Sequence, residues 1–409
     1  MDFNYTEEQE KLRKEVHEFF SSNLPSDYRP RGVGGTGTTL EQFQFWMDLQ
    51  RKAGAKGYLT PGWSKASGGL GLSDMEQGIV SEETSYWGAT WPGSQGIRVC
   101  GPPVHVFGTE EQKSTFLPGI AKGEVIWYQA FTEPDAGSDE ANVSLRATEE
   151  NDHYILNGQK TFITAPGPAD YLYTLARTQD VIPKHRGISL FLIDAHSPGI
   201  SYSALATLGI FTVDIFFDNV KVPKSRLLGE LNRGFYHAMV TFEFERSTTG
   251  AAAGARRNLE ELIEFCREEK RNGQPLLKDP AVRNLLADRA IEMELSWLQG
   301  WFAAWHFSQR DKLGSPPPEA GGLHGKVVSA DRAQQLIDSL GLYGQLRRGS
   351  KYCKYEGRAA NAWMSSRSTH PAGTIEINKI VLAGRGLGLP RIPAKFNKEI
   401  RAAVEGVGV

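Results

Sequence analysis

A candidate cofactor-binding turn runs from Phe131 to Asp139, with the sequence FTEPDAGSD. It follows an apolar, β-branched and aromatic run, so a strand should lead into it. Small residues let the backbone approach a ligand closely, and the hydroxyl and backbone N–H groups of such a turn can hold an anion. A purely structural loop has a similar composition, so the segment alone leaves both interpretations open.

A second candidate segment covers residues 157–164, with the sequence NGQKTFIT. In a strand, the alternation of side chains would place Phe162 and Thr164 on one face, where an aromatic ring and a hydroxyl suit the edge of a flat ring system. The alternative is a Phe162 in the core and a Thr164 on the surface. The Asn157-Gly158 pair is typical of a tight turn and predicts a hairpin between two strands.

The elements that must position these segments change along the chain. Apolar residues recur at helical spacing before residue 125, short β-branched runs separated by turns follow, and long amphipathic segments return beyond residue 231. We therefore expect an α+β fold with an N-terminal α-helical domain (1–124), a β-barrel or sandwich domain that holds both segments (125–231) and a C-terminal four-helix bundle (232–409). The longest helices are expected over 6–20, 40–54, 74–86, 234–270, 279–312, 326–345 and 351–366.

Composition excludes several functional classes. The 409 residues carry 46 Lys and Arg against 48 Asp and Glu, so no basic excess points to nucleic acid. No apolar run reaches the ~18 residues of a membrane span, and the charged N-terminus resembles neither a secretory signal nor a transit peptide. Cys100, Cys266 and Cys353 are far apart and lack metal-ligand spacing. We expect a cytoplasmic protein with reduced thiols, and no metal site, nucleic-acid partner or membrane span.

Together, in this order and at this spacing, the two segments resemble the flavin-binding strands of the acyl-CoA dehydrogenase family. TEPDAGSD matches the family's TEPxAGSD, and NGQKTFIT matches its NGxKxWIT with Phe162 at the usual Trp. The similarity continues through GISLFLID, VDIFFDNVKVPKSRLLGELNRGF and GTIEINKIVLAGRGLGLP, and so covers nearly the whole chain. It implies the family's α–β–α fold, FAD as cofactor, an acyl-CoA substrate, an electron-transferring flavoprotein as electron acceptor and usually a homotetramer.

The resemblance implies roles for residues of the turn. Thr132 and the backbone at Phe131 would contact the flavin ring. Gly137 and Ser138 would lie near the FAD pyrophosphate, and Ser138 would also lie beside the substrate.

Further FAD contacts are implied from the second segment and from the C-terminal region. Phe162 would cover the isoalloxazine, and Thr164 would form a hydrogen bond near its N5. Thr374 and Glu376 would touch the FAD from the C-terminal side.

The implied reaction needs a base for the substrate's α-proton. The α-C–H group is a weak acid, so the enzyme must stabilise the developing enolate and position a carboxylate of raised pKa. Most family members carry this carboxylate in a C-terminal YEGT segment. Here the segment reads His370-Pro371-Ala372-Gly373-Thr374, and alanine cannot accept a proton. By this position alone, the chain would be an inactive homologue.

A second placement of the base occurs in isovaleryl-CoA dehydrogenases and similar enzymes for branched or bulky substrates. They carry the glutamate on a helix in an LxLER-like segment, and residues 241–246 of this chain read TFEFER. Glu245 matches that position on an apolar helix, where burial would raise the pKa of a carboxylate. The alternative is a surface glutamate paired with Arg246 or Arg257. The alanine at 372 and the glutamate at 245 together favour Glu245 as the base.

Other substrate contacts follow from the same resemblance. The backbone N–H of residue 372 can still polarise the thioester carbonyl, because that role needs no side chain. The implied substrate-binding residues are Arg98, Ser138, Glu243, Arg246, Ala372 and Gly373, of which Glu243 and Arg246 align with the CoA channel.

Arg98 lies in a stretch, 93–100, that lines the acyl pocket in the family and is usually small or apolar. A buried arginine is costly unless it meets an anion, and a guanidinium binds a carboxylate in bidentate fashion. We therefore hypothesise a second carboxylate on the substrate, as in a succinyl-type or other dicarboxylic acyl-CoA. The alternative is an Arg98 that points to solvent or pairs with Glu82 or Glu83.

Two departures from the family affect assembly and leave three functions open. The second-subunit FAD segments RxxFG and QxxGGxG read EKRNG at 269–273 and DSLGLYG at 338–344, so a heterotetramer is an alternative to a homotetramer. The chain is expected to be a dehydrogenase for branched, alicyclic or aryl-substituted acyl groups. The alternatives are an oxygen-using oxidase or monooxygenase of the same fold, and a non-catalytic subunit of a mixed tetramer.

Overall fold

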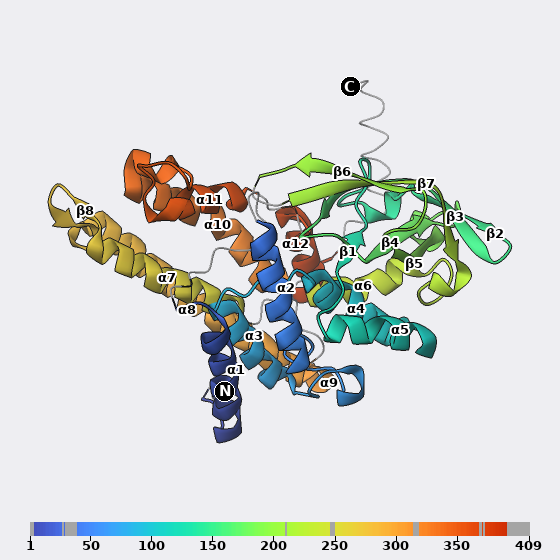
Figure 1. Cartoon of the computed structure of the whole chain (residues 1–409), viewed down its shortest axis with the longest axis horizontal. Coiled ribbons are helices and arrows are strands. Elements are labelled where there is room, and N and C mark those ends of the chain that lie inside the picture. Colours follow the sequence, from blue (N-terminus) through green and yellow to red (C-terminus); the bar gives the residue numbers. More distant parts are fainter. Residues whose placement is uncertain are drawn as a thin grey trace.

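A computed structural model describes residues 4–26, 28, 39–208, 211–245, 250–313, 319–367, 370 and 373–390. Figure 1 shows the strands gathered toward one end of the molecule and the long C-terminal helices reaching the other end, with the N-terminal helices between them. The expected α+β class and α–β–α order are confirmed.

The first part of the chain is helical. Four of its helices begin with a capping box, in which a Ser or Thr side chain and a Gln or Glu three residues later satisfy each other's backbone N–H groups. The π-helical turn η2 and the helix α4 lie in a Gly- and Pro-rich stretch that shows no helical periodicity in the sequence. The elements are α1 (Glu7–Asn23), α2 (Leu40–Ala55), η1 (Lys65–Ser67), α3 (Asp74–Tyr86), η2 (Gly96–Cys100), α4 (Gly101–Phe107) and α5 (Glu110–Ala121).

The middle part forms a curled seven-stranded sheet in the order β1-β4-β2-β3-β7-β6, with β5 paired to β4. Strands β1 and β4 are parallel, whereas β3, β7 and β6 form antiparallel pairs. Both faces of β4 and β5 are buried, which explains their continuous apolar sequences. The strands are β1 (Trp127–Ala130), β2 (Arg146–Glu150), β3 (His153–Thr164), β4 (Tyr171–Arg177), β5 (Ile188–Asp194), β6 (Ile200–Ala206) and β7 (Phe211–Pro223).

The hairpin predicted at Asn157-Gly158 is wrong. Strand β3 runs through this pair, and Gly158, with φ of 140°, forms a bulge against β7 instead of a turn. The actual reversal between β2 and β3 lies at Asn151-Asp152, where Asn151 has φ of 47°. Asn-Gly suits any backbone site that needs positive φ, and both a tight turn and a bulge provide one.

The last part is a helical bundle with its own apolar core, which includes Leu262, Leu286 and Leu336. The single helix expected over 234–270 is instead two helices, α6 and α7, and α10 begins earlier than expected. No helix within the described residues is long and apolar enough to cross a membrane. The helices are α6 (Gly234–Glu245), α7 (Ala251–Glu268), α8 (Pro280–Ser308), α9 (Arg310–Leu313), α10 (Glu319–Leu340), α11 (Arg358–Ser366) and α12 (Ile375–Val381).

Candidate active site

The turn after β1 is held in shape by its own backbone. Glu133 and Ala136 exchange two backbone hydrogen bonds, of 2.9 and 3.1 Å, which close a tight loop. Phe131 is buried at its base, whereas Gly137 and Ser138 are exposed at its tip. A Cβ added to Gly137 would meet no atom within 4 Å, so packing inside the chain does not explain this glycine. The exposed backbone at the tip is free of steric cover and can be approached closely by a ligand.

A buried ion pair joins the turn to the second candidate segment. Lys160 of β3 is fully buried; its Nζ lies 2.7 Å from Glu133 and donates to the carbonyl oxygen of Phe131 at 2.9 Å. Beside this pair, the backbone N–H of Thr161 donates to the carbonyl oxygen of Thr132 at 2.9 Å. The two segments recognised in the sequence are thus fixed to each other.

The ionisation of this pair depends on its surroundings. Burial lowers the pKa of Lys160 to about 8, although Glu133 opposes the shift. For Glu133, burial alone would raise the pKa, but Lys160 and the backbone N–H groups of Ser144 and Leu145 outweigh it and lower the pKa below its usual value. The carboxylate also accepts a 2.7 Å hydrogen bond from the Ser144 hydroxyl, so both of its oxygens accept hydrogen bonds inside the protein.

Phe162 stands on a bulge of β3. The register against β7 shifts between Lys160 and Ile163, and Phe162 has φ of 56°, which is unusual for a residue other than glycine. Its side chain is 59% exposed and Thr164 is also exposed, whereas Ile163 between them is buried. The expected shared face is present, and the alternative of a Phe162 in the core is excluded. A strained backbone that presents an aromatic ring outward is typical of a ligand site.

Gln95, which the sequence interpretation did not single out, connects the helical part to both strands. Its side-chain oxygen accepts a hydrogen bond from the backbone N–H of Gln129 in β1 at 2.6 Å, and its side-chain nitrogen donates to the carbonyl oxygen of Thr164 at 2.9 Å. One side chain therefore fixes the start of η2 against the strands that carry both candidate segments. The role of this side-chain amide could not be predicted from the sequence, because both contacts are long-range and depend on the fold.

Helix α6 packs directly behind the turn. The ring of Phe242 lies edge-on to Phe131 at 6.4 Å, and the hydroxyl groups of Tyr173 and Thr241 form a buried 2.9 Å hydrogen bond. Thr241 also donates to the carbonyl oxygen of Val99 at 3.3 Å, which ties α6 to η2. The structure describes this helix as far as Glu245.

Several residues proposed for catalysis or substrate binding lie partly or wholly outside the described residues. The backbone of Glu243 and Glu245 is in α6, but their side chains are outside the described residues, and Arg246 and Ala372 are wholly outside them.

The C-terminal candidates have structural roles of their own. The Thr374 hydroxyl caps α12 by accepting from the backbone N–H of Ile377 at 3.2 Å, and Glu376 is exposed in the first turn of that helix. Hydrogen bonds from its own backbone N–H and from Thr374 lower the pKa of Glu376. The carbonyl oxygen of Gly373 accepts from Asn378 at 3.0 Å and from Lys326.

Arg98 is exposed on η2, so the burial on which its carboxylate-binding role was argued is not present in this chain alone. The two carboxylates considered as its alternative partners have other partners. Glu82 accepts from Tyr5 and Trp297, and Glu83 from Arg13, with His17 2.9 Å away.

Comparison with known proteins places this geometry in a family. The models of the acyl-CoA dehydrogenase N-terminal, middle and C-terminal domains match residues 6–124, 129–220 and 232–387. The chain belongs to the acyl-CoA dehydrogenase family. It is 30% identical over 396 residues to the short-chain specific acyl-CoA dehydrogenase of Clostridium acetobutylicum, an alignment that covers 94% of this chain and 99% of that protein.

Two solved structures are similar along almost their whole length. The ChsE4-ChsE5 complex from Mycobacterium tuberculosis gives a TM-score of 0.82 at 29% identity and covers 96% of this chain and 100% of that chain. The Tcur3481-Tcur3483 steroid acyl-CoA dehydrogenase gives 0.83 at 29% identity, with the same coverage.

As an acyl-CoA dehydrogenase, the protein is an FAD-dependent oxidoreductase that acts on CH–CH groups. The described residues fit that cofactor. The outward ring of Phe162 offers a flat apolar surface, and the open tip at Gly137 and Ser138 offers backbone and hydroxyl groups to a phosphate.

Proposed function

We propose that the protein catalyses the α,β-dehydrogenation of an acyl-CoA thioester, with Glu245 as the base and an electron-transferring flavoprotein as the electron acceptor. The observation that carries this proposal is the network of Glu133, Lys160 and the Thr132–Thr161 hydrogen bond. It holds both candidate flavin-binding segments together beside α6, the helix that carries Glu245.

The position of Glu245 on α6 supports its role. Glu245 follows Thr241 by four residues, so the backbone of both residues lies on the same face of α6. On that face, the hydroxyl of Thr241 forms hydrogen bonds with Tyr173 and with the carbonyl oxygen of Val99. That face is directed toward η2 and the sheet, between the flavin-binding turn and the stretch assigned to the acyl pocket.

The chemistry divides between cofactor and protein. FAD supplies the capacity to accept the substrate's β-hydrogen as hydride. The protein removes the α-proton at the carboxylate of Glu245 and polarises the thioester carbonyl through the backbone N–H of Ala372. Glu243 and Arg246 line the CoA channel in this assignment, and Ser138 and Gly373 contact the substrate.

The acyl group is assigned as branched, alicyclic or aryl-substituted. The resemblance to isovaleryl-CoA dehydrogenases and similar enzymes for branched or bulky substrates implies this placement of the base, and one similar solved structure is named as a steroid acyl-CoA dehydrogenase. A second carboxylate on this group would meet Arg98 from η2, whose exposure allows a ligand to reach it.

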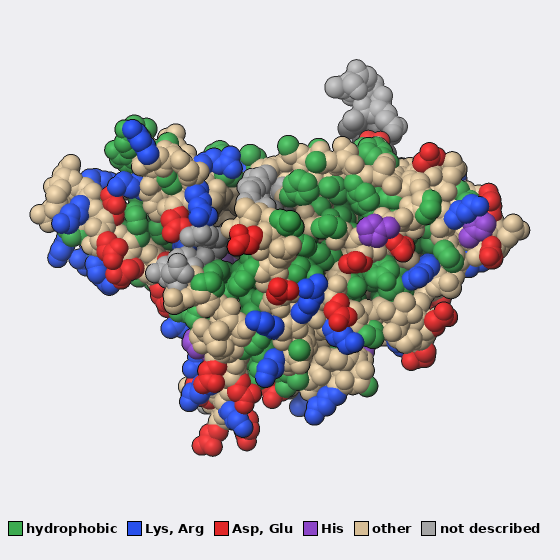
Figure 2. Space-filling view, in the orientation of Figure 1, with side chains coloured by type: hydrophobic (Ala, Val, Ile, Leu, Met, Phe, Trp, Pro, Cys, Tyr) green, Lys and Arg blue, Asp and Glu red, His purple; other side chains and the backbone are tan. Residues whose placement is uncertain are grey.

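Assembly into a tetramer is supported by an exposed apolar stripe on α8. Its residues recur at helical spacing and are each more than a third exposed: Ile291, Leu295, Leu298 and Phe302. Figure 2 shows further hydrophobic side chains gathered over β6 and β7, where Tyr202 and Phe216 are exposed. Both surfaces suit contact with another subunit.

The segments that replace the second-subunit FAD motifs are engaged within this chain. Arg271 pairs with Asp279 and donates to the carbonyl oxygen of Ser339, and Asp338 accepts from Gln334. A mixed tetramer is therefore kept as the alternative to a homotetramer, as one similar solved structure is a complex of two named chains.

The decisive experiment is anaerobic titration of the FAD-loaded protein with acyl-CoA esters, monitored by bleaching of the flavin absorbance. Reduction by a branched or ring-bearing ester, followed by reoxidation with electron-transferring flavoprotein, is the expected result. Rapid reoxidation by oxygen instead would favour the oxidase alternative. A purified protein that is colourless and cannot be reconstituted with FAD would rule the catalytic proposal out.

A further inference from the structure

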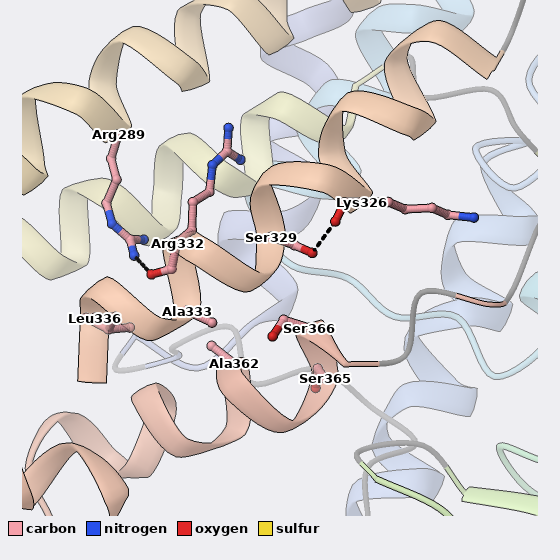
Figure 3. Close-up of a pocket in the computed structure, with 9 residues that line it drawn as sticks. All are labelled: Arg289, Lys326, Ser329, Arg332, Ala333, Leu336, Ala362, Ser365 and Ser366. Atoms are coloured by element: carbon pink, nitrogen blue, oxygen red, sulfur yellow. Dashed lines mark hydrogen bonds between the residues drawn. The ribbon is translucent and has the colours of Figure 1, made fainter. Parts of the chain in front are cut away.

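The cavity in the helical bundle lacks a convergent set of ligand groups. It lies between α8, α10 and α11 and has a volume of about 350 Å³. Figure 3 shows the charged ends of Arg289, Lys326 and Arg332 directed away from one another, and Arg289 donates to the backbone carbonyl of Arg332. A small-molecule site needs polar groups that converge on the ligand. These side chains therefore do not form one site.

The curled sheet has a seam between β1 and β3, which are not neighbours in the strand order. At one point backbone groups close the seam directly, because the N–H of Thr161 donates to the carbonyl oxygen of Thr132 at 2.9 Å. Three residues before Thr132 is Gln129, and three residues after Thr161 is Thr164. The N–H of Gln129 and the carbonyl oxygen of Thr164 both bond to the side chain of Gln95. The two segments therefore run antiparallel across the seam, with Gln95 between them.

Gln95 takes the place of a peptide group in this seam. Its Oε1 accepts from the N–H of Gln129 at 2.6 Å, and its Nε2 donates to the carbonyl oxygen of Thr164 at 2.9 Å. A side-chain amide offers a carbonyl and an N–H group, as the backbone does. The bridge lies two residues beyond the bulge at Phe162, where the register of β3 against β7 has shifted. Gln95 thus joins the end of β3 to β1 just beyond this irregularity.

The segment that carries Gln95 is itself fixed in place. Gln50 of α2 is fully buried, and its Oε1 accepts from the backbone N–H of Gly93 at 2.7 Å. On the other side of Gln95, a Cβ added to Gly96 would meet the Trp127 ring of β1 at 3.0 Å, so the start of η2 packs closely on that strand. The amide of Gln95 therefore relates the position of η2 to that of the end of β3.

We propose that Gln95 is a positioning residue for the flavin. Its bond to the carbonyl oxygen of Thr164 fixes the end of β3, and hence the Thr164 hydroxyl that is assigned to a hydrogen bond near the flavin N5. Gln95 also begins η2, the turn assigned to the acyl pocket, so one amide sets the distance between the flavin and the bound acyl group. Reacting groups must be held at close to the right distance for the chemistry to be fast. The inference rests on the proposed function, in which the flavin lies against Phe162 and Thr164.

Two substitutions separate this role from a role in folding alone. Gln95→Met removes both hydrogen bonds. Gln95→Glu keeps an acceptor for the N–H of Gln129 but places a carboxylate oxygen against the carbonyl oxygen of Thr164, and neither of these oxygens carries a proton to share. Thermal unfolding of the FAD-free proteins should therefore show at least as large a loss for Gln95→Met as for Gln95→Glu.

The order should be reversed for the flavin. In fluorescence titrations with FAD, we expect Gln95→Glu to bind about tenfold or more weakly than the wild type, and more weakly than Gln95→Met. The absorption spectrum of the bound flavin should also change in Gln95→Glu, because the group near N5 is displaced. Gln44→Glu, which adds the same charge at an exposed position of α2, is the matched control and should bind FAD as the wild type does. An FAD affinity that simply follows stability across the variants, or a wild-type affinity and spectrum in Gln95→Glu, overturns the proposal.

Thr164→Val distinguishes a failure of this inference from a failure of the flavin placement. The variant should weaken FAD binding and change the flavin spectrum as Gln95→Glu does. Unchanged binding and spectrum in Thr164→Val would overturn the placement of the flavin and, with it, the role of Gln95. A change in Thr164→Val without one in Gln95→Glu would overturn the role of Gln95 alone. None of these measurements uses an acyl-CoA, so their outcome is separate from that of the proposed dehydrogenation.

Discussion

The ammonium of Lys160 reaches from β3 to both Glu133 and the carbonyl oxygen of Phe131, at 2.7 and 2.9 Å, from a fully buried position. Glu133 in turn accepts from the backbone N–H groups of Ser144 and Leu145, so one ion pair connects three backbone segments around the turn that follows β1. Because both side chains are buried away from water, each charge is stabilised mainly by the opposite charge of its partner.

Replacing Lys160 by Met should therefore destabilise the fold. The change leaves Glu133 buried without its counter-ion, and breaking such a pair costs about 3–5 kcal/mol. Chemical unfolding of the variant should show this loss, together with weaker retention of FAD. The double variant Lys160→Met/Glu133→Gln should recover part of the stability, because it removes the stranded charge. A single variant as stable as the wild type would show that the pair contributes nothing.

The same pair predicts a dependence of stability on acid. The pKa of Glu133 lies below its usual 4.5 in the folded chain. A carboxylate of this kind contributes stability that is fully present above the unfolded pKa and is lost as the pH falls through the folded pKa. The melting temperature of the wild type should therefore fall more steeply between pH 6 and acid conditions than that of Glu133→Gln. Parallel curves for the two proteins would contradict this assignment.

Phe162 offers a test that separates ligand binding from folding. Its φ of 56° is a strained backbone for phenylalanine but not for glycine, and such strain costs about 1–3 kcal/mol. We expect Phe162→Gly to leave the stability of the FAD-free protein unchanged or raised, while FAD affinity falls because the exposed ring is lost. Phe162→Trp, the residue usual in the family, should retain FAD. If Phe162→Gly binds FAD as the wild type does, the ring is not part of the flavin site.

The sequence predicted the order of elements because that order depends on local patterns, and the flavin-binding role of the two candidate segments stays a prediction. Capping residues such as Thr109 and the continuous apolar runs of β4 and β5 are visible without tertiary information. The placement of the hairpin failed at Asn157-Gly158, since positive φ is required by a bulge as well as by a turn. The break between α6 and α7 was also missed. In the structure Gly250 has φ of 84°, and a Cβ there would meet the backbone of Ser81 at 2.6 Å, but neither feature is visible in the sequence.

The partners of the site residues could not be predicted in the same way. Lys160 was within a recognised motif, but its pairing with Glu133, 27 residues earlier, depends on how β3 lies against the turn. Gln95 makes two hydrogen bonds to strands 34 and 69 residues away, and no periodicity records such contacts.

Glu245→Gln tests the assigned base. Glutamine keeps the size and hydrogen-bonding capacity of the side chain but cannot accept the substrate's α-proton. The rate of flavin reduction by a competent acyl-CoA should fall by at least ~10², the usual contribution of general base catalysis. FAD content and substrate affinity should remain close to those of the wild type. A near-normal reduction rate would mean that another carboxylate removes the proton.

Arg98→Gln tests whether the exposed guanidinium on η2 receives a second carboxylate of the substrate. The measurement compares kcat/KM for monocarboxylic and dicarboxylic acyl-CoA esters of similar size in both proteins. If the contact forms in the transition state, the variant should lose about 2–5 kcal/mol for the diacids alone, because a guanidinium–carboxylate pair enclosed by the bound substrate is poorly screened by water. The monocarboxylic esters are the internal control, since they make no such contact. Equal losses for both classes, or a wild type without preference for diacids, would remove Arg98 from the site and leave it as a solvent-facing residue of η2.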